Sequence, residues 1–541
     1  MKSLCFEKLE QRELLTVSLV GDEVLVNVLT AGGQRLTAEA SAVATSTAGD
    51  SVAVFEGKGR VDDQGVFFRR FDVEGAPLSD AIRVNTTIRE GQFSPSVDIA
   101  DDGTFVVTWH GRGLGDQRGV FAQWYDADGV AVGTETLVNS TTGGVQQNAV
   151  IAAGQDNVVV VWEGTGVGDL DGIFMRRFDS TGRAISAEML VNSATAKQQA
   201  FPDVAMGSDG SFIVTWSSRH QDGSDWGVYA QRFDAEGDRL GGEFQVNSTV
   251  EASQVQASVA TDEGGEFTIA WSSLGQDGDS WGVFAQKYAG NGNPIRSEIQ
   301  LNATTEAHQK DVDITIASGG RIEATWTRGV PDGSGWEVVV RTFDAAGEPD
   351  SDEVLVNANI SGPNSGHQQA PSIASSSDQI AIAWSGRGTS DRHGVFLQGL
   401  RDDQVNLPPQ LEPIPDQEAT VGEELEVPVS ATDPNPDDIL TFFLDTDDSP
   451  ASAILQQIDN QNAVIRWTPA AADLLGPVPF RVIVVDDGTP PLADSESFLV
   501  FLSPVGQVDE AFAGDELMLG RAEALSELSA LDGFFGALGR N

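Results

Sequence analysis

Residues 211–216 read SFIVTW, a run of β-branched and aromatic residues that is typical of a strand in a half-buried sheet. Runs of this kind end in an aromatic residue at intervals of 53 to 58 residues, namely at Phe55, Trp109, Trp162, Trp216, Trp271, Trp326 and Trp384. A Val/Leu-Asn pair keeps the same interval, with its asparagine at Asn27, Asn85, Asn139, Asn192, Asn247, Asn302 and Asn357. A repeat of this length indicates that one supersecondary unit has been copied into an array or a closed ring.

One repeat can be followed strand by strand between residues 201 and 247. The apolar segments 201–206 and 211–216 are separated by GSDG, a sequence typical of a tight turn. A polar loop leads to residues 227–233, where apolar and polar residues alternate, and residues 243–247 form a fourth segment. Four antiparallel strands in about 54 residues are typical of one blade of a β-propeller.

The two ends of the repeat region indicate how the ring closes. Residues 23–27 read EVLVN, as do residues 353–357, so the chain begins with the strand type that ends a blade elsewhere. The last strand, 394–398, leaves its own blade one strand short. We therefore predict an all-β fold in which residues 17–402 form a seven-bladed β-propeller of four-stranded blades, with the N-terminal strand as a latch.

The chain changes character on either side of the repeats. Residues 1–16 form a short N-terminal tag, and residues 506–541 carry apolar residues at helical spacing among acids, which predicts an acidic amphipathic helical tail. Residues 403–505 are predicted to form one β-sandwich domain, because prolines and Asp/Gly clusters separate its short strands. The expected strands are 424–429, 440–444, 463–467, 480–485 and 497–502.

The composition limits the classes of partner. The chain has 32 Lys and Arg against 82 Asp and Glu, a net charge of −50, and such a surface repels nucleic acid. Acidity of this kind suits a well-solvated protein or one that collects divalent cations. The single Cys5 excludes an internal disulfide. No segment reaches the roughly 18 apolar residues of a membrane helix, so we expect no transmembrane segment, and we expect a monomer.

Strand alternation places the variable loops, which follow each Val-Asn pair and each tryptophan, on one face of the ring. Function often resides on such loops because a rigid scaffold holds them. Glutamines precede the first strand of most blades, at Gln92, Gln146, Gln199, Gln254, Gln309 and Gln368. Acids follow the tryptophans, at Asp62, Asp116, Asp169, Asp279 and Asp391, with Asp222 and Asp332 slightly earlier. We expect both series to be bonds that fix the blades; weak Ca²⁺ binding is the alternative for the acids.

Two segments resemble known sequences. Residues 6–16, FEKLEQRELLT, resemble the FExLExRxLLT tag of many exported and surface proteins in one group of budding bacteria. The motifs NLPP (406–409), ATDP (431–434), WTP (467–469) and VDDG (485–488) are similar to those of dystroglycan-type cadherin-like and putative immunoglobulin-like modules of bacterial surface proteins. The tag implies a secreted or cell-surface location.

The cadherin-like resemblance implies bound Ca²⁺, because cadherins bind this ion through carboxylates at domain junctions. The matching positions are Asp402, Asp403, Asp433, Asp437, Asp438, Asp486 and Asp487. The middle acidic motif of cadherins is absent, since IRW at 465–467 occupies its neighbourhood. The resemblance therefore implies a partial Ca²⁺ site.

No catalytic constellation stands out from the repeat. The three tyrosines occupy strand positions shared with phenylalanine, which argues against a sialidase-type nucleophile. His308 and His367 share a position beside the glutamine series, where we expect hydrogen-bonded loop histidines. Metal-ligand spacing is absent from the set of five histidines, His110, His220, His308, His367 and His393. Paired carboxylates for glycoside hydrolysis remain open, because 82 acids offer many pairs.

These observations predict that the protein is not an enzyme. The leading hypothesis is an exported or cell-surface binding or adhesion protein, with Ca²⁺ dependence as an option, that uses its loop face for a protein or glycan ligand. The alternative is a propeller-fold glycosidase or lyase, or a carbohydrate-binding lectin. Propeller folds host unrelated functions, so the fold does not name the ligand.

Overall fold

The computed structural model describes residues 17–504 except residues 31, 38–40, 155–156, 331–334, 358–366, 377–378, 389–390, 403–407, 434, 436–437, 446–448 and 488–490. The predicted tag and helical tail lie outside the described residues. The chain divides into two compact units, residues 1–404 and 405–541. The described residues form strands, loops and two short 3-10 turns, Ser318–Gly320 and Ala471–Asp473. Within this part of the chain, no helix is long and apolar enough to cross a membrane.

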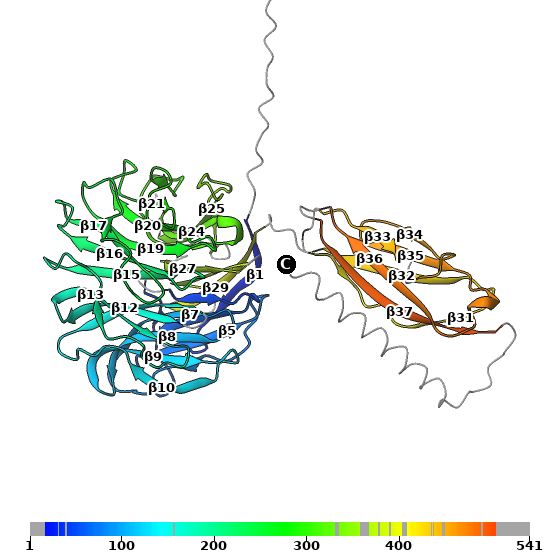
Figure 1. Cartoon of the computed structure of the whole chain (residues 1–541), viewed down its shortest axis with the longest axis horizontal. Coiled ribbons are helices and arrows are strands. Elements are labelled where there is room, and N and C mark those ends of the chain that lie inside the picture. Colours follow the sequence, from blue (N-terminus) through cyan, green and yellow to red (C-terminus); the bar gives the residue numbers. More distant parts are fainter. Residues whose placement is uncertain are drawn as a thin grey trace, which may run out of the picture. The chain divides into compact units, whose positions relative to one another are not determined.

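The first unit is a β-propeller of seven sheets, as the repeat predicts (Figure 1). Six sheets have four strands and one has five, because the inner strand of the first blade is split in two. The inner strands contact one another in the closed order β3, β7, β11, β15, β19, β23, β27 and back to β3. The sheets are therefore the blades of a closed ring.

The strands run outward from the centre in each blade. In blades 1 to 4 they are β2 (Gln34–Arg35) with β3 (Val43–Thr45), β4 (Ser51–Gly57), β5 (Gly65–Phe71), β6 (Ile82–Arg83); β7 (Gln92–Ile99), β8 (Phe105–Gly113), β9 (Asp116–Tyr125), β10 (Ala131–Leu137); β11 (Gln146–Ala153), β12 (Val158–Gly166), β13 (Asp169–Phe178), β14 (Met189–Leu190); β15 (Gln199–Met206), β16 (Phe212–Arg219), β17 (Trp226–Phe233), β18 (Phe244–Gln245). In blades 5 to 7 they are β19 (Gln254–Thr261), β20 (Phe267–Leu274), β21 (Trp281–Tyr288), β22 (Ile299–Gln300); β23 (Gln309–Ile316), β24 (Ile322–Gly329), β25 (Trp336–Phe343), β26 (Val354–Leu355); β27 (Gln369–Ser375), β28 (Gln379–Gly386), β29 (Gly394–Asp402), β1 (Val17–Leu25).

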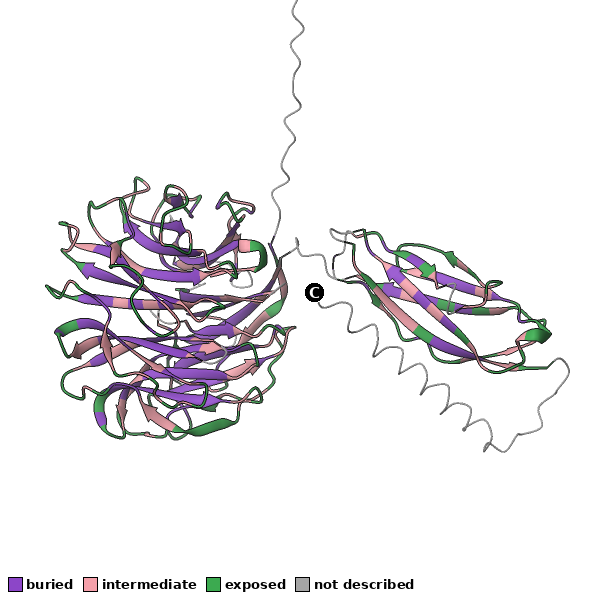
Figure 2. Ribbon diagram, viewed as in Figure 1, coloured by how far each residue is buried: buried purple, intermediate pink, exposed green. Residues whose placement is uncertain are grey.

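The repeated tryptophans lie where neighbouring blades pack. Trp162, for example, is fully buried in a cluster that combines residues of blades 2 and 3, and its ring centroid lies 6.3 Å from that of Phe174. Burial follows the middle strands of the blades, and the exposed residues gather at their ends (Figure 2). An aromatic side chain buries about 150–250 Å², which contributes about 4–6 kcal/mol at ~25 cal/mol per Å². This burial accounts for a large aromatic residue in each repeat.

The N-terminal strand closes the ring, as predicted. β1 pairs antiparallel with β29, from Val17 opposite Asp402 to Leu25 opposite Phe396. Asn27 continues the contact, because its Oδ1 accepts the Val395 N–H at 2.8 Å. The first strand of the chain thus becomes the outer strand of the last blade, and β29 is not left as an open edge.

A bulge recurs in six of the inner strands, two residues after the glutamine. The residue there has a positive φ although it is not glycine; the six are Ser94, Asn148, Phe201, Gln256, Asp311 and Ala370. Its N–H is directed to the preceding blade: Ser94 N donates to Glu56 Oε2 at 2.7 Å, and Phe201 N donates to Glu163 Oε2 at 2.8 Å. The bulge therefore joins blades at the mouth of the ring.

Half-buried carboxylates join neighbouring inner strands farther from the loops. Asp98 Oδ2 accepts the Ala153 N–H at 2.7 Å, and Asp203 Oδ2 accepts the Val259 N–H at 2.8 Å. Burial raises the pKa of Asp98 to about 6. Burial and the neighbouring Asp313 charge raise the pKa of Asp203 to about 8. In the folded protein both carboxyl groups therefore keep their proton up to a higher pH than an aspartate in the unfolded chain.

The second unit contains two four-stranded sheets. One is β30 (Gln410–Leu411), β32 (Leu425–Thr432), β35 (Asn462–Trp467) and β34 (Ile454–Gln457); the other is β31 (Gln417–Thr420), β37 (Ala493–Ser503), β36 (Val478–Val485) and β33 (Thr441–Leu444). Both contribute to one core, in which Trp467 packs edge-on to Phe480 at 5.3 Å and Phe480 stacks on Phe498 at 5.2 Å. Two sheets over a shared core make a β-sandwich, and all five expected strands are present.

Deletion of residues 1–27 should destabilise the propeller. Val17 and Val26 are at most 4% exposed, and losing two such side chains costs about 3–6 kcal/mol before the lost strand pairing is counted. Thermal unfolding should show a much lower Tm for this variant than for a deletion of residues 1–16, which keeps β1. Equal melting temperatures of the two deletions would mean that β1 is not the latch.

The pH dependence of stability should report the inner-strand acids. Between pH 4 and 8 the folded state holds a proton on Asp203 that the unfolded chain has lost, so its contribution to the free energy of unfolding falls as pH rises. Asp203→Asn removes this penalty, so its Tm relative to the wild type should increase from pH 4 to pH 8. The exposed Asp101→Asn is the control and should show a constant difference. A constant difference for Asp203→Asn as well would contradict the assignment.

Candidate functional site

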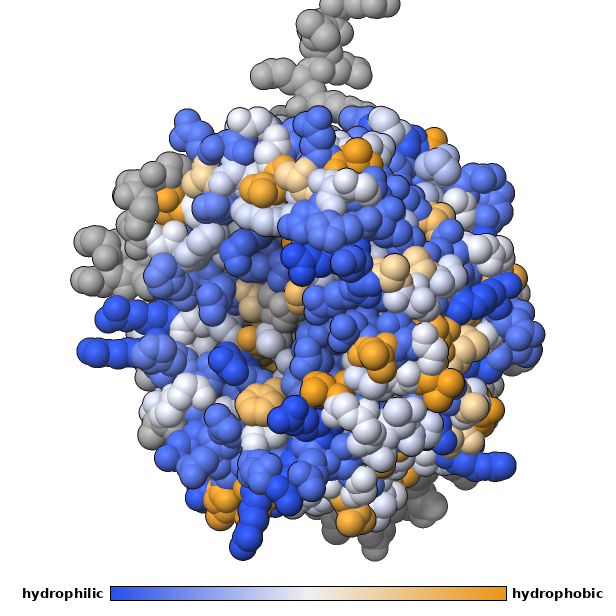
Figure 3. Space-filling view, turned by 90° about the vertical axis from the view of Figure 1, so that its left-hand side faces the viewer, coloured by the Kyte–Doolittle hydropathy of each residue, from blue (hydrophilic) through white to orange (hydrophobic). Residues whose placement is uncertain are grey.

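The two faces of the ring carry different connections. Tight turns close one face; in one of them Gly103, with φ of 80°, donates its N–H to Ala100 O at 2.9 Å. The longer loops after the tryptophan strands and after the Asn residues lie on the other face, the loop face, as predicted. Figure 3 looks onto the loop face, which is largely hydrophilic and is hollowed near its centre.

The predicted acid series on the loop face fixes the blades. Asn85 Nδ2 donates to Asp62 Oδ2 at 2.7 Å, while Asn85 Oδ1 accepts the Val66 N–H at 2.8 Å. Equivalent Asn–Asp bonds join Asn139 to Asp116, Asn192 to Asp169 and Asn27 to Asp391. These carboxylates are buried and bonded within their own blades, which supports the structural interpretation of the series.

One member of the acid series was assigned wrongly. Asn302 Nδ2 donates to Asp277 Oδ2 at 2.9 Å, whereas the predicted Asp279 accepts the Ala307 N–H instead. The loop from the tryptophan to the glycine is one residue longer in this blade, and the acid stands one residue nearer the tryptophan, so it precedes the glycine by five residues rather than three. Asp222 also precedes its glycine by five residues, and Asp332 lies outside the described residues.

The glutamine series has a seventh member that the sequence analysis missed. Gln34 pairs with Gly57 in the register that Gln92 has with Gly111. Gln34 was missed because its spacing from the tryptophan position differs from that of the other glutamines. Phe55 follows Gln34 by 21 residues, whereas Trp109 follows Gln92 by 17. The spacing from the asparagine would have found it, since Gln34 follows Asn27 by seven residues, as Gln92 follows Asn85.

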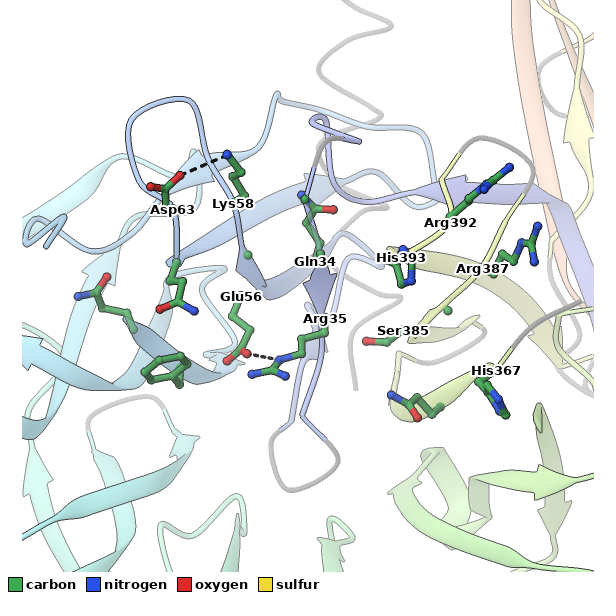
Figure 4. Close-up of a pocket in the computed structure, with 18 residues that line it drawn as sticks. Gln34, Arg35, Glu56, Lys58, Asp63, His367, Ser385, Arg387, Arg392 and His393 are labelled. Atoms are coloured by element: carbon green, nitrogen blue, oxygen red, sulfur yellow. Dashed lines mark hydrogen bonds and ion pairs between the residues drawn. The ribbon is translucent and has the colours of Figure 1, made fainter. Parts of the chain in front are cut away.

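The loop face carries a pocket of about 740 Å³ where blades 7, 1 and 2 meet. Blade 1 contributes Gln34, Arg35, Glu56, Lys58, Asp63 and Gln64; blade 2 contributes Gln92 and Phe93; blade 7 contributes His367, Gln369, Ser385, Arg387, Arg392 and His393. In Figure 4 the labelled blade-1 side chains stand on one side, the blade-7 side chains on the other, and Gln34 lies between them. The pocket coincides with the ring closure.

Glu56 is the buried carboxylate of this pocket. It is 4% exposed, and its Oε1 accepts a short hydrogen bond from Arg35 Nε, while Oε2 holds the Ser94 N–H. Asp63, the other acid in the lining, forms an ion pair with Lys58 at 3.3 Å and is largely exposed. Of these two acids, Glu56 is thus the one held in a fixed orientation.

The pocket is rich in basic groups although the chain is strongly acidic. Its lining holds Arg35, Lys58, Arg387 and Arg392, and two histidines, against only two carboxylates. Arg35 and Lys58 are paired with those carboxylates, whereas Arg387 and Arg392 have no ion-pair partner among the described carboxylates. The local balance is therefore opposite to that of the chain, whose net charge is −50.

The histidines occupy separate environments. His308 packs against Trp336, with ring centroids 5.7 Å apart, and His367 and His393 line the pocket. His110 accepts the Asn148 N–H at Nδ1, and burial lowers its pKa to about 4. In the described part of the chain, no histidine belongs to a group with metal-ligand geometry.

The second unit brings three of the predicted Ca²⁺ ligands together. Carboxylate oxygens of Asp433, Asp438 and Asp486 lie within 4.8 Å of one another. Burial raises the pKa of Asp433, and the nearby Asp486 charge raises it further. Asp487 instead accepts the Ile439 N–H at 2.7 Å. Asp402 ends β29 with a side chain that is not described, and Asp403 and Asp437 lie outside the described residues.

Comparisons with known proteins found distant similarity to solved structures. No family model matches the chain, and no curated protein matches its sequence. Similar solved structures include the β-propeller domain of the Trilobed protease from Pyrococcus furiosus (10% identity, 68% of this chain and 93% of that one, TM-score 0.40). The α-L-arabinanase from Penicillium chrysogenum (11%, 71% and 100%, 0.38) and the endo-arabinase from Bacteroides thetaiotaomicron (11%, 43% and 88%, 0.29) are similar too.

These comparisons correct the prediction that the protein is not an enzyme. Two of the three structures named above are an α-L-arabinanase and an endo-arabinase. At identities of 10–11% the similarity concerns the fold and carries no activity over to this chain. The chemistry has to be argued from the pocket itself.

Proposed function

We propose that the protein binds a saccharide in the loop-face pocket and cleaves its glycosidic bond. The observation that carries this proposal is the lining: amides, guanidinium groups, imidazoles and carboxylates surround a space of about 740 Å³. Pockets of roughly 300–1,000 Å³ with a few fixed polar groups are typical small-ligand sites. Planar polar side chains offer two atoms each, which suits the adjacent hydroxyl groups of a sugar ring.

Phe93 adds an apolar surface to this polar lining. It is half-buried at the start of β7, and its ring lies 5.7 Å from that of His110. The C–H face of a sugar ring packs on such an aromatic side chain while its hydroxyl groups meet the polar groups. The combination of one aromatic ring with many planar polar groups favours a saccharide over a purely apolar ligand.

Glu56 is the carboxylate that we assign to the reaction. Hydrolysis of a glycosidic bond uses carboxyl groups that flank the bond, as nucleophile or general base and as general acid. Glu56 and Asp63 are the two carboxylates of the lining, and Glu56 is held in one orientation by Arg35 and by Ser94 N. This fixed orientation suits a nucleophile or general base, whose position must be set before the substrate binds.

Glu56→Gln should abolish turnover. Loss of a general acid or base typically lowers rates by about 10²–10⁴-fold, so kcat/KM should fall at least about 100-fold in a reducing-end assay on a panel of neutral and acidic oligosaccharides. Glu163→Gln is the matched control, because Glu163 accepts the equivalent blade-to-blade hydrogen bond from Phe201 N outside the pocket.

The controls separate catalysis from structure. Equal losses in Glu56→Gln and Glu163→Gln would mean that Glu56 only joins blades. Saccharide binding with no turnover by the wild type would identify a lectin, and the reaction assigned to Glu56 would be wrong.

We also propose that the protein is exported and remains at or near the cell surface, as a monomer that meets its glycan there. The support is the resemblance of residues 6–16 to an export tag and of residues 406–488 to cadherin-like and immunoglobulin-like modules. An acidic, disulfide-free chain suits such surroundings. Fractionation of cells that carry the full-length protein, with and without residues 1–16, tests the location.

Ca²⁺ binding by the second unit is a second candidate function. Three carboxylates within 4.8 Å repel one another unless a proton or a cation neutralises them. Ca²⁺ takes clustered oxygen ligands, and extracellular modules bind it with Kd of about 10⁻⁴–10⁻³ M. Asp433, Asp438 and Asp486 would supply protein ligands, which fits part of the predicted cadherin-like set.

Millimolar Ca²⁺ should raise the Tm of the second unit in calorimetry. With a Kd of about 10⁻⁴–10⁻³ M, 1 mM Ca²⁺ stabilises the folded unit by about 0.4–1.4 kcal/mol. Asp433→Ala and Asp486→Ala should each remove most of the rise, while Asp459→Asn, an exposed acid of the same unit outside the cluster, should keep it. Equal effects of Mg²⁺ and Ca²⁺ that persist in the cluster variants would mean general charge screening.

A further inference from the structure

Gln34 differs from the other members of the glutamine series in its hydrogen bonds. Gln92 Oε1 accepts from Asn85 Nδ2 at 3.0 Å, and Gln92 Nε2 donates to Arg112 O at 3.3 Å. In blade 7, Gln368 Oε1 accepts from Trp384 Nε1 and its Nε2 donates to Arg387 O. Gln34 Oε1 and Nε2 have no hydrogen-bond partner within the described part of the chain, although Gln34 is only 3% exposed.

Gln146 Oε1 and Gln309 Oε1 also lack a partner, but their Nε2 atoms donate to backbone carbonyls, whereas Gln34 lacks a partner at both atoms. The asparagine seven residues before Gln34 does not supply its Oε1 with a donor. Asn27 Nδ2 donates to Asp391 Oδ2 and to Leu29 O, and it makes no bond to Gln34. Asn85 Nδ2 makes the equivalent bonds to Asp62 Oδ2 and Thr87 O, and it also donates to Gln92 Oε1. A buried amide without partners is costly and uncommon in folded proteins. Because Gln34 lines the pocket, a bound ligand can supply both the missing donor and the missing acceptor.

The unpaired charges in the lining of the same pocket indicate what kind of group that ligand carries. Arg387 and Arg392 line the blade-7 side without a described carboxylate partner, next to His367 and His393. Guanidinium groups bind the planar or tetrahedral oxygens of carboxylates and sulfates through paired N–H donors. A chain of net charge −50 repels anions elsewhere on its surface, so an anionic ligand would be held by this local set of groups.

We infer that the pocket selects an anionic saccharide, one that bears a carboxylate or a sulfate ester. The anionic group binds Arg387 and Arg392, and the Gln34 amide donates to and accepts from the same sugar residue. This inference rests on the proposed function, because it specifies the substrate class of the same site. It also assigns the ring closure as the part of the loop face that determines specificity.

The test is a binding titration by calorimetry with full-length protein. The probes are an oligogalacturonate, its neutral methyl ester and a sulfated oligogalactan of the same length. We expect the two anionic probes, or one of them, to bind at least tenfold more tightly than the neutral one, with an affinity that falls as NaCl is raised. Preference for only one of the anionic probes identifies the group as carboxylate or sulfate.

Variants test the assigned residues. Arg387→Ala combined with Arg392→Ala should lower affinity for the anionic probe at least tenfold and leave affinity for the neutral one within about twofold. Gln34→Glu adds a negative charge at the orphaned amide and should also weaken anion binding. Arg118→Ala is the control, because Arg118 is an exposed loop-face arginine outside the pocket.

The outcomes separate this inference from the proposed function. Tight binding of the anionic probes without turnover would support the inference about the substrate class and contradict the proposed cleavage reaction. Turnover with equal affinity for neutral and anionic probes keeps the reaction and overturns the inference. Loss of anion binding in Arg118→Ala to the same extent as in the double variant would also overturn it, because attraction would then be diffuse.

Discussion

The contact between Asn27 and Asp391, 364 residues apart, is the hydrogen bond on which the geometry of the ring closure depends. It continues the antiparallel pairing of β1 with β29 and gives the last blade its outer strand. Pairing with β1 protects the edge of β29, which would otherwise be free to pair with another chain. The inner strands and the buried tryptophans stabilise the blades, but the closure decides whether the blades form a ring.

The repeated pattern of strands and hydrogen bonds changes at this ring closure. In the other blades each described glutamine of the series keeps at least one hydrogen bond to its own blade, for example Gln92 to Asn85 and Gln146 to Thr165 O. At the seam the inner strand of blade 1 is split, and the glutamine amide is left over beside a pocket. A ring of similar blades has no preferred position for a ligand until one junction differs from the others. The seam supplies that difference, which is why we place both the proposed reaction and its specificity there.

Much of the fold could be predicted from the sequence because the repeat multiplies each signal. The tryptophan interval predicts the seven blades, and the identical EVLVN segments predict that the N-terminal strand closes the ring. Asp277 and Gln34 were missed because insertions of a few residues shift a position out of a spacing measured from one landmark. The pocket could not be predicted, since Arg35 and Arg392 become neighbours of one cavity only after the ring closes. The clustering of Asp433, Asp438 and Asp486 followed from the resemblance and not from any spacing rule, and its occupancy by Ca²⁺ stays a prediction.

The latch also sets an order of events during synthesis. β1 is the first described strand to leave the ribosome, yet its partner β29 begins only at Gly394. At about 5–20 residues per second, roughly 20 to 75 s pass between the two. During that interval the other blades are synthesised while β1 has no strand to pair with. The blade that β1 completes is not yet formed. A translational pause before residue 394 therefore lengthens the time that β1 spends without its partner strand.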